Sequence, residues 1–269
     1  MRIRRNKMAW VEAILLGILQ GLTEFLPVSS SGHLVLARSL MPDLETPGIL
    51  FEVLLHLGTL GSVLYFFRRE VKEMLLSCLP GGETASRRLV LYIVAASIPT
   101  AFAGFLLRKQ IHLLFKSVQT TALMLLVTGV LLILSDLLSK PRVGIYRMGY
   151  LRAFGVGLWQ SAALMPGLSR SGSTISGARL MGIVGEDAAK FSFLISIPAV
   201  GGAALLELKD AGPLDAHVLA LCLTGALAAF LAGLAALGLL LAVVKKSRLR
   251  WFAYYCWAAG LTVLALGLK

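Results

Sequence analysis

The sequence predicts an all-α integral membrane protein, built as an inverted-topology repeat with six transmembrane helices and two re-entrant helix–break–helix segments. Three observations lead to this prediction: the apolar composition, the spacing of apolar stretches, and a repeat between two polar motifs. Of the 269 residues, 57% are hydrophobic and 15% are charged, and the mean hydropathy is +0.81. Soluble domains contain about 25% charged residues. We therefore expect lipid to surround most of the surface.

Six stretches are long and apolar enough to cross a bilayer, which takes about 20 residues per helix. They cover residues 48–67, 89–107, 117–138, 188–207, 216–244 and 251–268. Two further apolar stretches, at 8–41 and 149–181, are interrupted near their middles by Pro27 and by Pro166, each followed by serines. Because neither side of a break is long enough to cross, each stretch is expected to return to its own side. Broken backbone is tolerated at membrane depth only inside protein or beside water.

The two interrupted stretches align when the sequence is shifted by 140 residues. The shift places Gln20 on Gln160 and Ser29 on Ser169, and the following spans then fall in the same order. Each repeat, 1–140 and 141–269, holds one interrupted stretch and three spans within a single membrane domain. An odd number of crossings inverts the second repeat, so the two re-entrant tips are expected to meet near the midplane, where such folds place their site.

The basic residues lie mostly in short loops between the apolar stretches. The net charge of +12 is therefore typical of membrane flanks, and no nucleic-acid partner is expected. The loops opposite the N-terminus carry more Lys and Arg, which predicts that they are cytoplasmic and that both termini are outside. The basic start, MRIRRNK, argues against this orientation. No small-residue cleavage site follows it, so it is interpreted as mature protein rather than as a signal peptide. The aromatic run at 251–257 is interpreted as an interfacial belt.

The first tip, QGLTEFLPVSSSGH at 20–33, contains a carboxylate within an apolar stretch. A charge at the membrane centre costs about 2.5–3.5 kcal/mol, so Glu24 is a functional candidate. Gln20 and Glu24 are four residues apart and share one helix face. Two oxygen donors on one face can hold a hard divalent cation. The alternative is that Gln20 only links helices and that Glu24 forms a structural pair with Arg170.

Serines follow the break at both tips. Serines at a helix start cap free N–H groups, and the same N–H groups form an anion site. The second tip, GLSRSGSTI, adds Arg170, whose planar fork of donors suits phosphate. The residues predicted to bind a phosphate-bearing substrate are Gln20, Ser29, Ser169, Ser171, Ser173 and Thr174. The alternative is that some of these serines are caps and nothing more.

Ser30 and His33 are one helical turn apart at the start of the second half-helix. A serine beside a base is the arrangement that activates a hydroxyl nucleophile. The sequence leaves open whether Ser30 attacks with His33 as its base or whether His33 attacks directly. Glu52 and His56 share a face of the first span, where they either line a cavity or form hydrogen bonds between helices.

The paired motifs resemble those of the bacterial undecaprenyl-diphosphate phosphatases of the bacitracin-resistance type. That family is marked by E/Q-x-x-x-E running into a serine-rich turn and a histidine, and by P-G-x-S-R-S-G. The resemblance covers essentially the whole chain. It implies hydrolysis of undecaprenyl diphosphate to undecaprenyl phosphate, which recycles the lipid carrier of cell-wall synthesis. It also implies a location in the bacterial inner membrane, with the active site facing the periplasm.

The resemblance implies roles for individual residues as well. Glu24, Ser30, His33 and Arg170 would be catalytic, and a divalent metal, Mg²⁺ or Ca²⁺, would bind at Glu24 and Gln20. The family accepts Glu or Gln at the first motif position. Gln20 offers an oxygen ligand but one negative charge fewer.

Two rival functions are considered. Inverted repeats with broken helices are typical of secondary transporters, so the chain could instead carry or flip the polyprenyl phosphate. A broader phosphatase acting on shorter prenyl diphosphates is the second rival. A transporter needs no nucleophile, so Ser30 with His33 favours an enzyme. The chain-length preference stays open, as does the oligomeric state, with a homodimer among the options.

Overall fold

The computed structural model describes residues 2–40, 49–115, 117–209, 215–246 and 248–267, and every regular element in these ranges is a helix. The predicted all-α class is therefore confirmed. The elements are α1 (Arg2–Phe25), α2 (Ser30–Leu40), α3 (Ile49–Phe66), α4 (Arg68–Ser77), α5 (Thr84–Leu106), α6 (Arg108–Leu114), α7 (Val118–Leu138), η1 (Ile145–Arg147), α8 (Tyr150–Ala162), α9 (Arg170–Leu180), α10 (Gly185–Lys209), α11 (Ala216–Lys245) and α12 (Arg250–Ala265).

Four helices, α5, α7, α10 and α11, are long and apolar enough to cross a membrane. They correspond to four of the six predicted spans. The predicted span 48–67 forms α3, which reaches the required length only together with α4, across a bend of 78°. The predicted span 251–268 forms α12, whose 16 residues are fewer than the about 20 that a crossing needs. The described residues thus contain four or five candidate spans, and six crossings are not confirmed.

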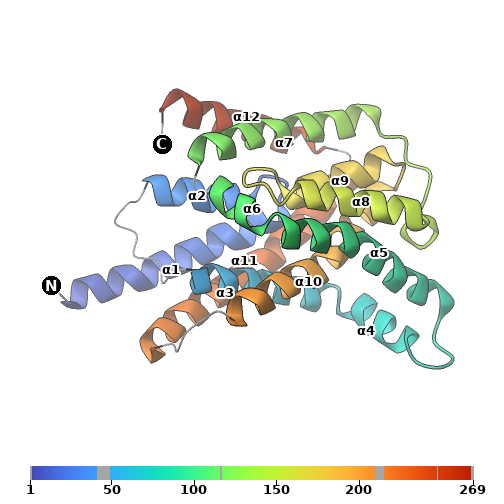
Figure 1. Ribbon diagram of the computed structural model, residues 1–269, viewed down its shortest axis with the longest axis horizontal. Coiled ribbons are helices and arrows are strands. Elements are labelled where there is room, and N and C mark those ends of the chain that lie inside the picture. The colour runs from blue at the N-terminus through green and yellow to red at the C-terminus, as the bar shows by residue number, and fades with distance from the viewer. Residues whose placement is uncertain (1, 41–48, 116, 210–214, 247, 268–269) are drawn as a thin grey trace.

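The two interrupted stretches each form a pair of helices that pack side by side. α1 is followed by α2 across a break that contains Pro27, and α8 is followed by α9 across a break that contains Pro166. Both breaks use left-handed backbone, with φ of 69° at Ser29 and 88° at Gly167. Figure 1 shows α1 and α2 reaching the centre from one end of the molecule and α8 and α9 from the other. Each pair is therefore a helical hairpin.

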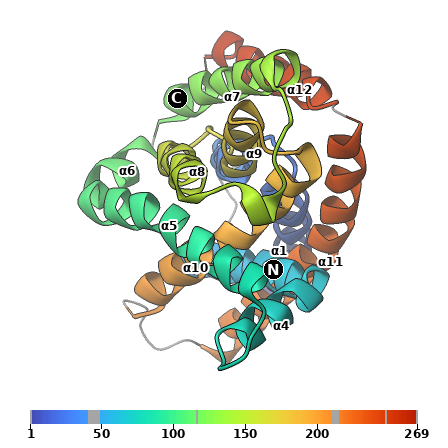
Figure 2. The same ribbon diagram turned by 90° about the vertical axis from the view of Figure 1, so that its right-hand side faces the viewer.

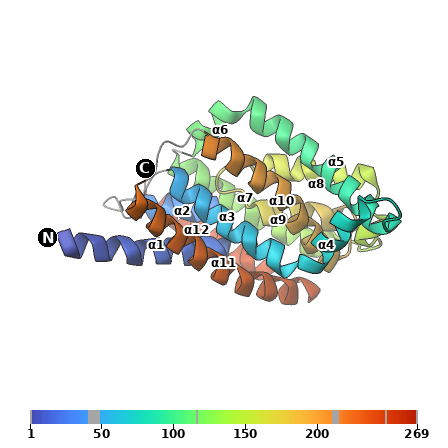
Figure 3. The same cartoon turned by 90° about the horizontal axis from the view of Figure 1, so that it is seen from below.

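The longer helices surround these hairpins. In the end-on view of Figure 2, α9 lies in the middle of a ring of other helices. Residues 171–179 of α9 are accordingly all buried. Figure 3 shows the start of α1 and the end of α12 at one end of the molecule and α4 at the opposite end.

Glycines allow the first helix of each hairpin to cross a long helix very closely. A Cβ atom on Gly17 would lie 2.3 Å from the Gly225 carbonyl oxygen of α11, and one on Gly157 would lie 2.2 Å from the Ala96 carbonyl oxygen of α5. Small residues at helix crossings are the usual means of close packing in membranes. Gly17 and Gly157 are also equivalent under the 140-residue shift. The aligned positions therefore make equivalent crossings.

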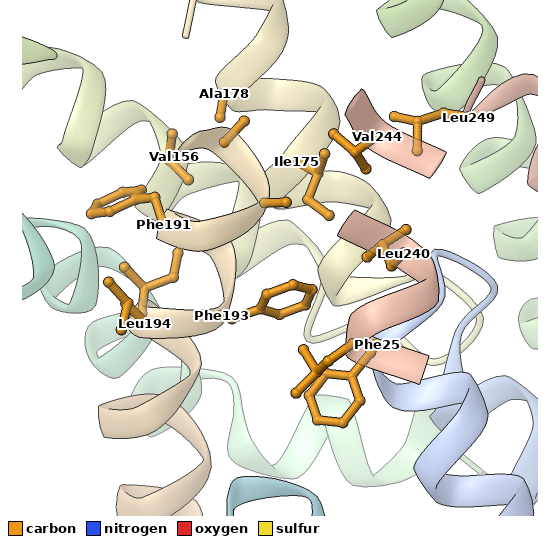
Figure 4. Packing of buried hydrophobic residues seen from close by; sticks show 14 of the residues in the cluster. Phe25, Val156, Ile175, Ala178, Phe191, Phe193, Leu194, Leu240, Val244 and Leu249 are labelled. Carbon is orange, nitrogen blue, oxygen red and sulfur yellow. The ribbon is translucent and has the colours of Figure 1, made fainter. Parts of the chain in front are cut away.

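The apolar core begins directly behind the first tip. Phe25, which follows Glu24, is 1% exposed, and its ring meets Phe193 of α10 edge to face, with centroids 5.5 Å apart. Figure 4 shows these two rings pointing toward one another, with Leu240 and Ile175 beside them. Aromatic pairs of this geometry add about 0.5–1.5 kcal/mol beyond their burial. The end of α1 is thus anchored to the core.

Candidate active site

The tips of the two hairpins meet, and Glu24 lies at the junction. The Ser171 hydroxyl of the second tip donates a hydrogen bond to the Leu26 carbonyl oxygen of the first, at 3.2 Å. Arg170, the first residue of α9, forms an ion pair through Nη2 with Glu24 Oε1. Glu24 and Arg170, which are 146 residues apart in sequence, thus form the ion pair that the sequence analysis gave as the alternative to a metal-binding role of Glu24.

The Glu24 carboxylate accepts hydrogen bonds from three helices, and a fourth brings His56 close to it. Besides Arg170, Gln20 Nε2 donates to Oε2 at 2.8 Å, and the Ser30 hydroxyl donates to the same oxygen at 2.6 Å. His56 Nε2 of α3 lies 3.8 Å from Oε2. The Glu24 side chain is only 6% exposed. Hydrogen bonds to an ionised group are about twice as strong as those between neutral groups, so these partners stabilise a buried carboxylate.

Arg170 keeps part of its hydrogen-bonding capacity unused. Its Nη1 is buried and has no hydrogen-bond partner among the described residues, whereas Nη2 is bound to Glu24. Buried donors without a partner are rare in native structures. Arg170 also begins α9, and the positive end of a helix attracts anions. The free half of the guanidinium can therefore bind an anionic substrate.

Ser30 and His33 were predicted to act as a pair, but the structure gives them different hydrogen-bond partners. Ser30 donates to Glu24, whereas His33 Nδ1 lies 2.7 Å from the Ser29 carbonyl oxygen and Nε2 lies 2.6 Å from the Tyr255 hydroxyl. A carbonyl oxygen only accepts, so Nδ1 carries a proton. The rings of His33 and Tyr255 are parallel within 6°. The structure therefore does not show the expected serine–histidine contact: the group that accepts the Ser30 hydrogen bond is the Glu24 carboxylate.

The flanking serines hold the tips together. Ser29 Oγ accepts from the Gly32 amide at 3.2 Å, and Ser169 Oγ accepts from the Gly172 amide at 3.0 Å. Each of the two capping hydroxyls also contacts a second serine hydroxyl, that of Ser31 or of Ser171. Ser29 has left-handed backbone, which costs of order 1–3 kcal/mol in a non-glycine residue and clusters at functional sites. Ser29 and Ser169 thus act as helix caps, the alternative left open by the sequence.

Two other predicted substrate-binding residues lie behind the tip. Ser173 and Thr174 are fully buried inside α9. The Thr174 hydroxyl donates to the Arg170 carbonyl oxygen at 2.7 Å and also contacts the Ser192 hydroxyl of α10. Ser173 Oγ is buried and has no hydrogen-bond partner in the part of the chain that the structure describes. The structure therefore gathers Gln20, Glu24, Ser30 and Arg170 at one point, and Thr174 supports Arg170 from below.

Sequence reasoning missed two neighbours of the site. His56 was recognised as a polar residue of the first span, but its position beside Glu24 depends on how α3 packs against α1. Tyr255 was interpreted as part of an interfacial belt, yet it bonds His33 across 222 residues. In the sequence, the one feature that could have indicated their place at the site is that each is a polar residue within an apolar helix.

The side-chain oxygens of Gln20 and Glu24 are the predicted ligands of a divalent cation. Among the described residues, no group of three or more His, Cys, Asp and Glu side chains is placed to hold a metal ion. Gln20 Oε1, however, is buried beside Glu24 without a hydrogen-bond partner. Mg²⁺ commonly binds one or two protein ligands together with substrate phosphates and water. The residues therefore fit a cation that shares its ligands with a phosphate, rather than one enclosed by protein alone.

A helical chain with several candidate spans and a charged site among its inner helices is a multi-pass membrane protein. The family model described as "Bacitracin resistance protein BacA" matches residues 13–262, and the chain belongs to this family.

Similar proteins cover nearly the whole chain. A protein of Syntrophotalea carbinolica is 44% identical over 255 residues, which cover 94% of this chain and 97% of the relative. A protein of Desulfatibacillum aliphaticivorans is 42% identical over 272 residues, covering 96% and 98%. A protein of Methanobrevibacter smithii is 41% identical over 268 residues, covering 94% and 96%. All three are named undecaprenyl-diphosphatase.

Proposed function

We propose that this protein is a membrane phosphatase that hydrolyses undecaprenyl diphosphate to undecaprenyl phosphate and inorganic phosphate, recycling the lipid carrier of cell-wall synthesis. One observation carries the proposal. The Ser30 hydroxyl bonds a carboxylate whose other oxygen is paired with Arg170. The names of the similar proteins support the substrate. A carrier that only moves the lipid needs no hydroxyl nucleophile beside a base, so the site favours hydrolysis over transport.

Arg170 is the proposed binding residue for the diphosphate. Its unpartnered Nη1 offers a donor to a phosphate oxygen, and the N-terminus of α9 adds a positive dipole. Charge spreads over the phosphoryl oxygens in the transition state, so fixed donors stabilise it. Ser169 and Thr174 hold the start of α9 in place, through the Gly172 amide and the Arg170 carbonyl. Ser169 and Thr174 therefore act by positioning Arg170.

Ser30 is the proposed nucleophile and Glu24 its base. Ser30 Oγ attacks the terminal phosphorus while its proton passes to Glu24 Oε2, 2.6 Å away. The bond from that phosphorus to the bridging oxygen breaks, and the lipid monophosphate leaves. Water then hydrolyses the phosphoserine and releases phosphate. A positioned base contributes about 10²–10⁴-fold. His33 is a weaker candidate for the attacking atom because Tyr255 occupies its Nε2.

A divalent cation, Mg²⁺ or Ca²⁺, is part of the proposal. Gln20 Oε1 and Glu24 would hold it together with phosphate oxygens, in keeping with the preference of hard cations for oxygen ligands. When bound, it supplies positive charge to the phosphoryl oxygens.

Phosphate release by the purified protein tests both the reaction and the metal. We expect turnover of undecaprenyl diphosphate with Mg²⁺ or Ca²⁺, loss of turnover in excess chelator, and recovery when either cation is restored. Farnesyl diphosphate in parallel reports on chain length. Full activity in excess chelator would contradict the requirement for a divalent cation. If no phosphate is released with either cation, the proposed phosphatase activity is wrong.

We further propose that the two hairpins are re-entrant segments of an inverted repeat, 1–140 and 141–269, in the bacterial inner membrane. The hairpins enter from opposite ends (Figure 1), and their aligned glycines make equivalent crossings. Gln20 and Gln160, which also align, both have a buried side-chain oxygen that accepts no hydrogen bond from the described residues. In this arrangement, α3 with α4 and α12 provide the remaining crossings. The charge pattern places the site on the periplasmic side.

Cysteine labelling tests this orientation. Lys109 of α6 and Lys140, which follows α7, are exposed residues assigned to opposite sides of the membrane. In a background without Cys78, Cys222 and Cys256, we expect Lys109→Cys to react with an impermeant maleimide on whole cells. Lys140→Cys is expected to react only after permeabilisation. The reverse labelling pattern would show that the orientation in the membrane is opposite to the proposed one. Labelling of both variants in whole cells would show that the number of crossings between the two positions is wrong.

A further inference from the structure

Thr128 lies in the middle of α7, a helix that carries neither motif, within the apolar run MLLVTGVLLIL. The residue is fully buried. Its hydroxyl lies 3.0 Å from the Met124 carbonyl oxygen, one turn earlier on the same helix. Threonine in an apolar helix commonly donates to such a carbonyl, and this contact alone would give Thr128 no part in the site.

Two further contacts link the same hydroxyl to the break between α8 and α9. The Ser169 backbone N–H donates to Thr128 Oγ1 at 3.0 Å, and the Gly167 carbonyl oxygen lies 3.1 Å from Oγ1. A hydroxyl has one proton and two lone pairs, so Oγ1 accepts from Ser169 while its own proton is directed to the Gly167 or the Met124 carbonyl. Thr128 therefore contacts the break on both sides of Leu168.

The break lies directly against α7. Gly167 has a φ of 88°, and a Cβ atom at this position would lie 2.1 Å from the Thr121 carbonyl oxygen of α7. Ser169 is 1% exposed, so its N–H group would be left buried without a partner if the Thr128 hydroxyl were removed. Because such a group is unfavourable, we expect the backbone of the break to shift when the hydroxyl is lost.

α7 is itself packed closely against α12. A Cβ atom on Gly129, the residue after Thr128, would lie 2.3 Å from Trp257 Nε1 of α12. The same Nε1 donates to the Leu126 carbonyl oxygen at 3.1 Å. Helices this close leave little room for α7 to move. The Thr128 hydroxyl is therefore a fixed point for the break.

The path of the break determines where Arg170 lies. Ser169 caps α9 by accepting from the Gly172 amide at 3.0 Å, and Arg170 follows as the first residue of the helix. Its Nη2 is paired with Glu24, and its buried Nη1 has no partner among the described residues. With one arm held in this way, a small shift of the backbone changes where the other arm points. A misplacement of about 1 Å can cost about 10²-fold in rate.

We propose that Thr128 is a positioning residue for the diphosphate. Its hydroxyl holds the backbone at 167–169 so that Arg170 directs its free Nη1 to a phosphate oxygen. The inference rests on the proposed function, in which Arg170 binds the diphosphate. In this role Thr128 does not touch the substrate and acts through Ser169 and Arg170.

Thr128→Val tests the role of the hydroxyl, because valine has nearly the same shape without it. We expect kcat for undecaprenyl diphosphate to fall about 10- to 100-fold, in the range caused by misplacement of a substrate-binding group. Thr128→Ser, which keeps the hydroxyl, is expected to retain most of the activity. Thr121→Val is the matched control. Thr121 is fully buried on the same helix, and its hydroxyl donates to the Ser117 carbonyl oxygen, so normal turnover is expected.

A double variant shows whether Thr128 acts through Arg170. Groups that act as one unit give non-additive losses. Adding Thr128→Val to Arg170→Lys is therefore expected to cause little further loss of kcat, because the guanidinium that Thr128 positions is absent. Losses that multiply would show that Thr128 affects turnover by another route, and they would overturn the proposal.

Binding of inorganic pyrophosphate gives a second measurement, which does not depend on turnover. Pyrophosphate carries the two phosphates without the lipid, so it is expected to raise the melting temperature of the detergent-solubilised protein. We expect the full increase for Thr121→Val and Thr128→Ser and a smaller one for Thr128→Val. If valine prevents folding, Thr128→Ala removes the hydroxyl without adding a methyl group.

Three results distinguish the proposals. Normal kcat and a normal pyrophosphate response in the folded variant without the hydroxyl overturn the positioning role. Equal losses in Thr128→Ser and Thr128→Val overturn it as well, since the hydroxyl is then not what matters. If the unmodified protein releases no phosphate from the lipid but shows the expected pyrophosphate pattern, the phosphatase is wrong and the positioning of Arg170 by Thr128 is supported.

Discussion

Ser30→Ala is expected to lower kcat for undecaprenyl diphosphate by at least about 10³-fold, because loss of a nucleophile that acts with its base removes most of the catalysis. The variant keeps Arg170 and Glu24, so substrate binding is expected to persist. Phosphate release under single-turnover conditions measures the chemical step. The affinity of the detergent-solubilised variant for the substrate shows whether the binding site is intact.

Double variants identify the base. Groups that act as one unit give strongly non-additive losses. Ser30→Ala combined with Glu24→Gln is therefore expected to be little worse than either single variant. His33 contacts Tyr255 rather than Ser30, so the losses from Ser30→Ala and His33→Ala are expected to multiply. Ser39→Ala is the control on the same helix, because the Ser39 hydroxyl donates to the Leu36 carbonyl oxygen within α2. If the losses from Ser30→Ala and His33→Ala are instead non-additive, His33 rather than Glu24 acts as the base.

Arg170→Lys is expected to reduce kcat by about 10²-fold although the positive charge is kept, in the range seen when one donor to a transition state is lost. Arginine can bind Glu24 with one arm and phosphate with the other, whereas a single ammonium group cannot reproduce that fork. Steady-state kinetics measure the effect. Arg88→Lys, an exposed position on α5, is the control and is expected to be normal. Near-normal turnover of Arg170→Lys would show that a local positive charge is sufficient.

Local pattern was sufficient for several features of the fold. The long apolar runs predicted α5, α7, α10 and α11 because a helix that satisfies all its backbone groups is the favoured structure in lipid. Proline and serines inside two apolar stretches predicted the breaks, since proline ends a helix and serine caps the next one. The 140-residue shift predicted which residues would make equivalent contacts, and Ser29 and Ser169 do cap equivalent helices.

Two features of the helices depended on more than apolar length. The bend of 78° between α3 and α4 and the 16-residue length of α12 are properties of the backbone path that the structure shows. Hydropathy averaged along the chain registers neither, because it treats a bent pair and a straight helix alike.

The sequence by itself determined the helical membrane class, the two tips and the residue types that they carry. Only the tertiary structure decided which of these residues are partners. Ser30 and His33 are one turn apart, yet each has a different partner. His33 contacts Tyr255 of α12, and Ser30 donates to Glu24 at the end of α1. His56 reaches Glu24 because α3 packs against α1. Such contacts depend on how helices far apart in sequence cross, and periodicity within one helix carries no information about that crossing.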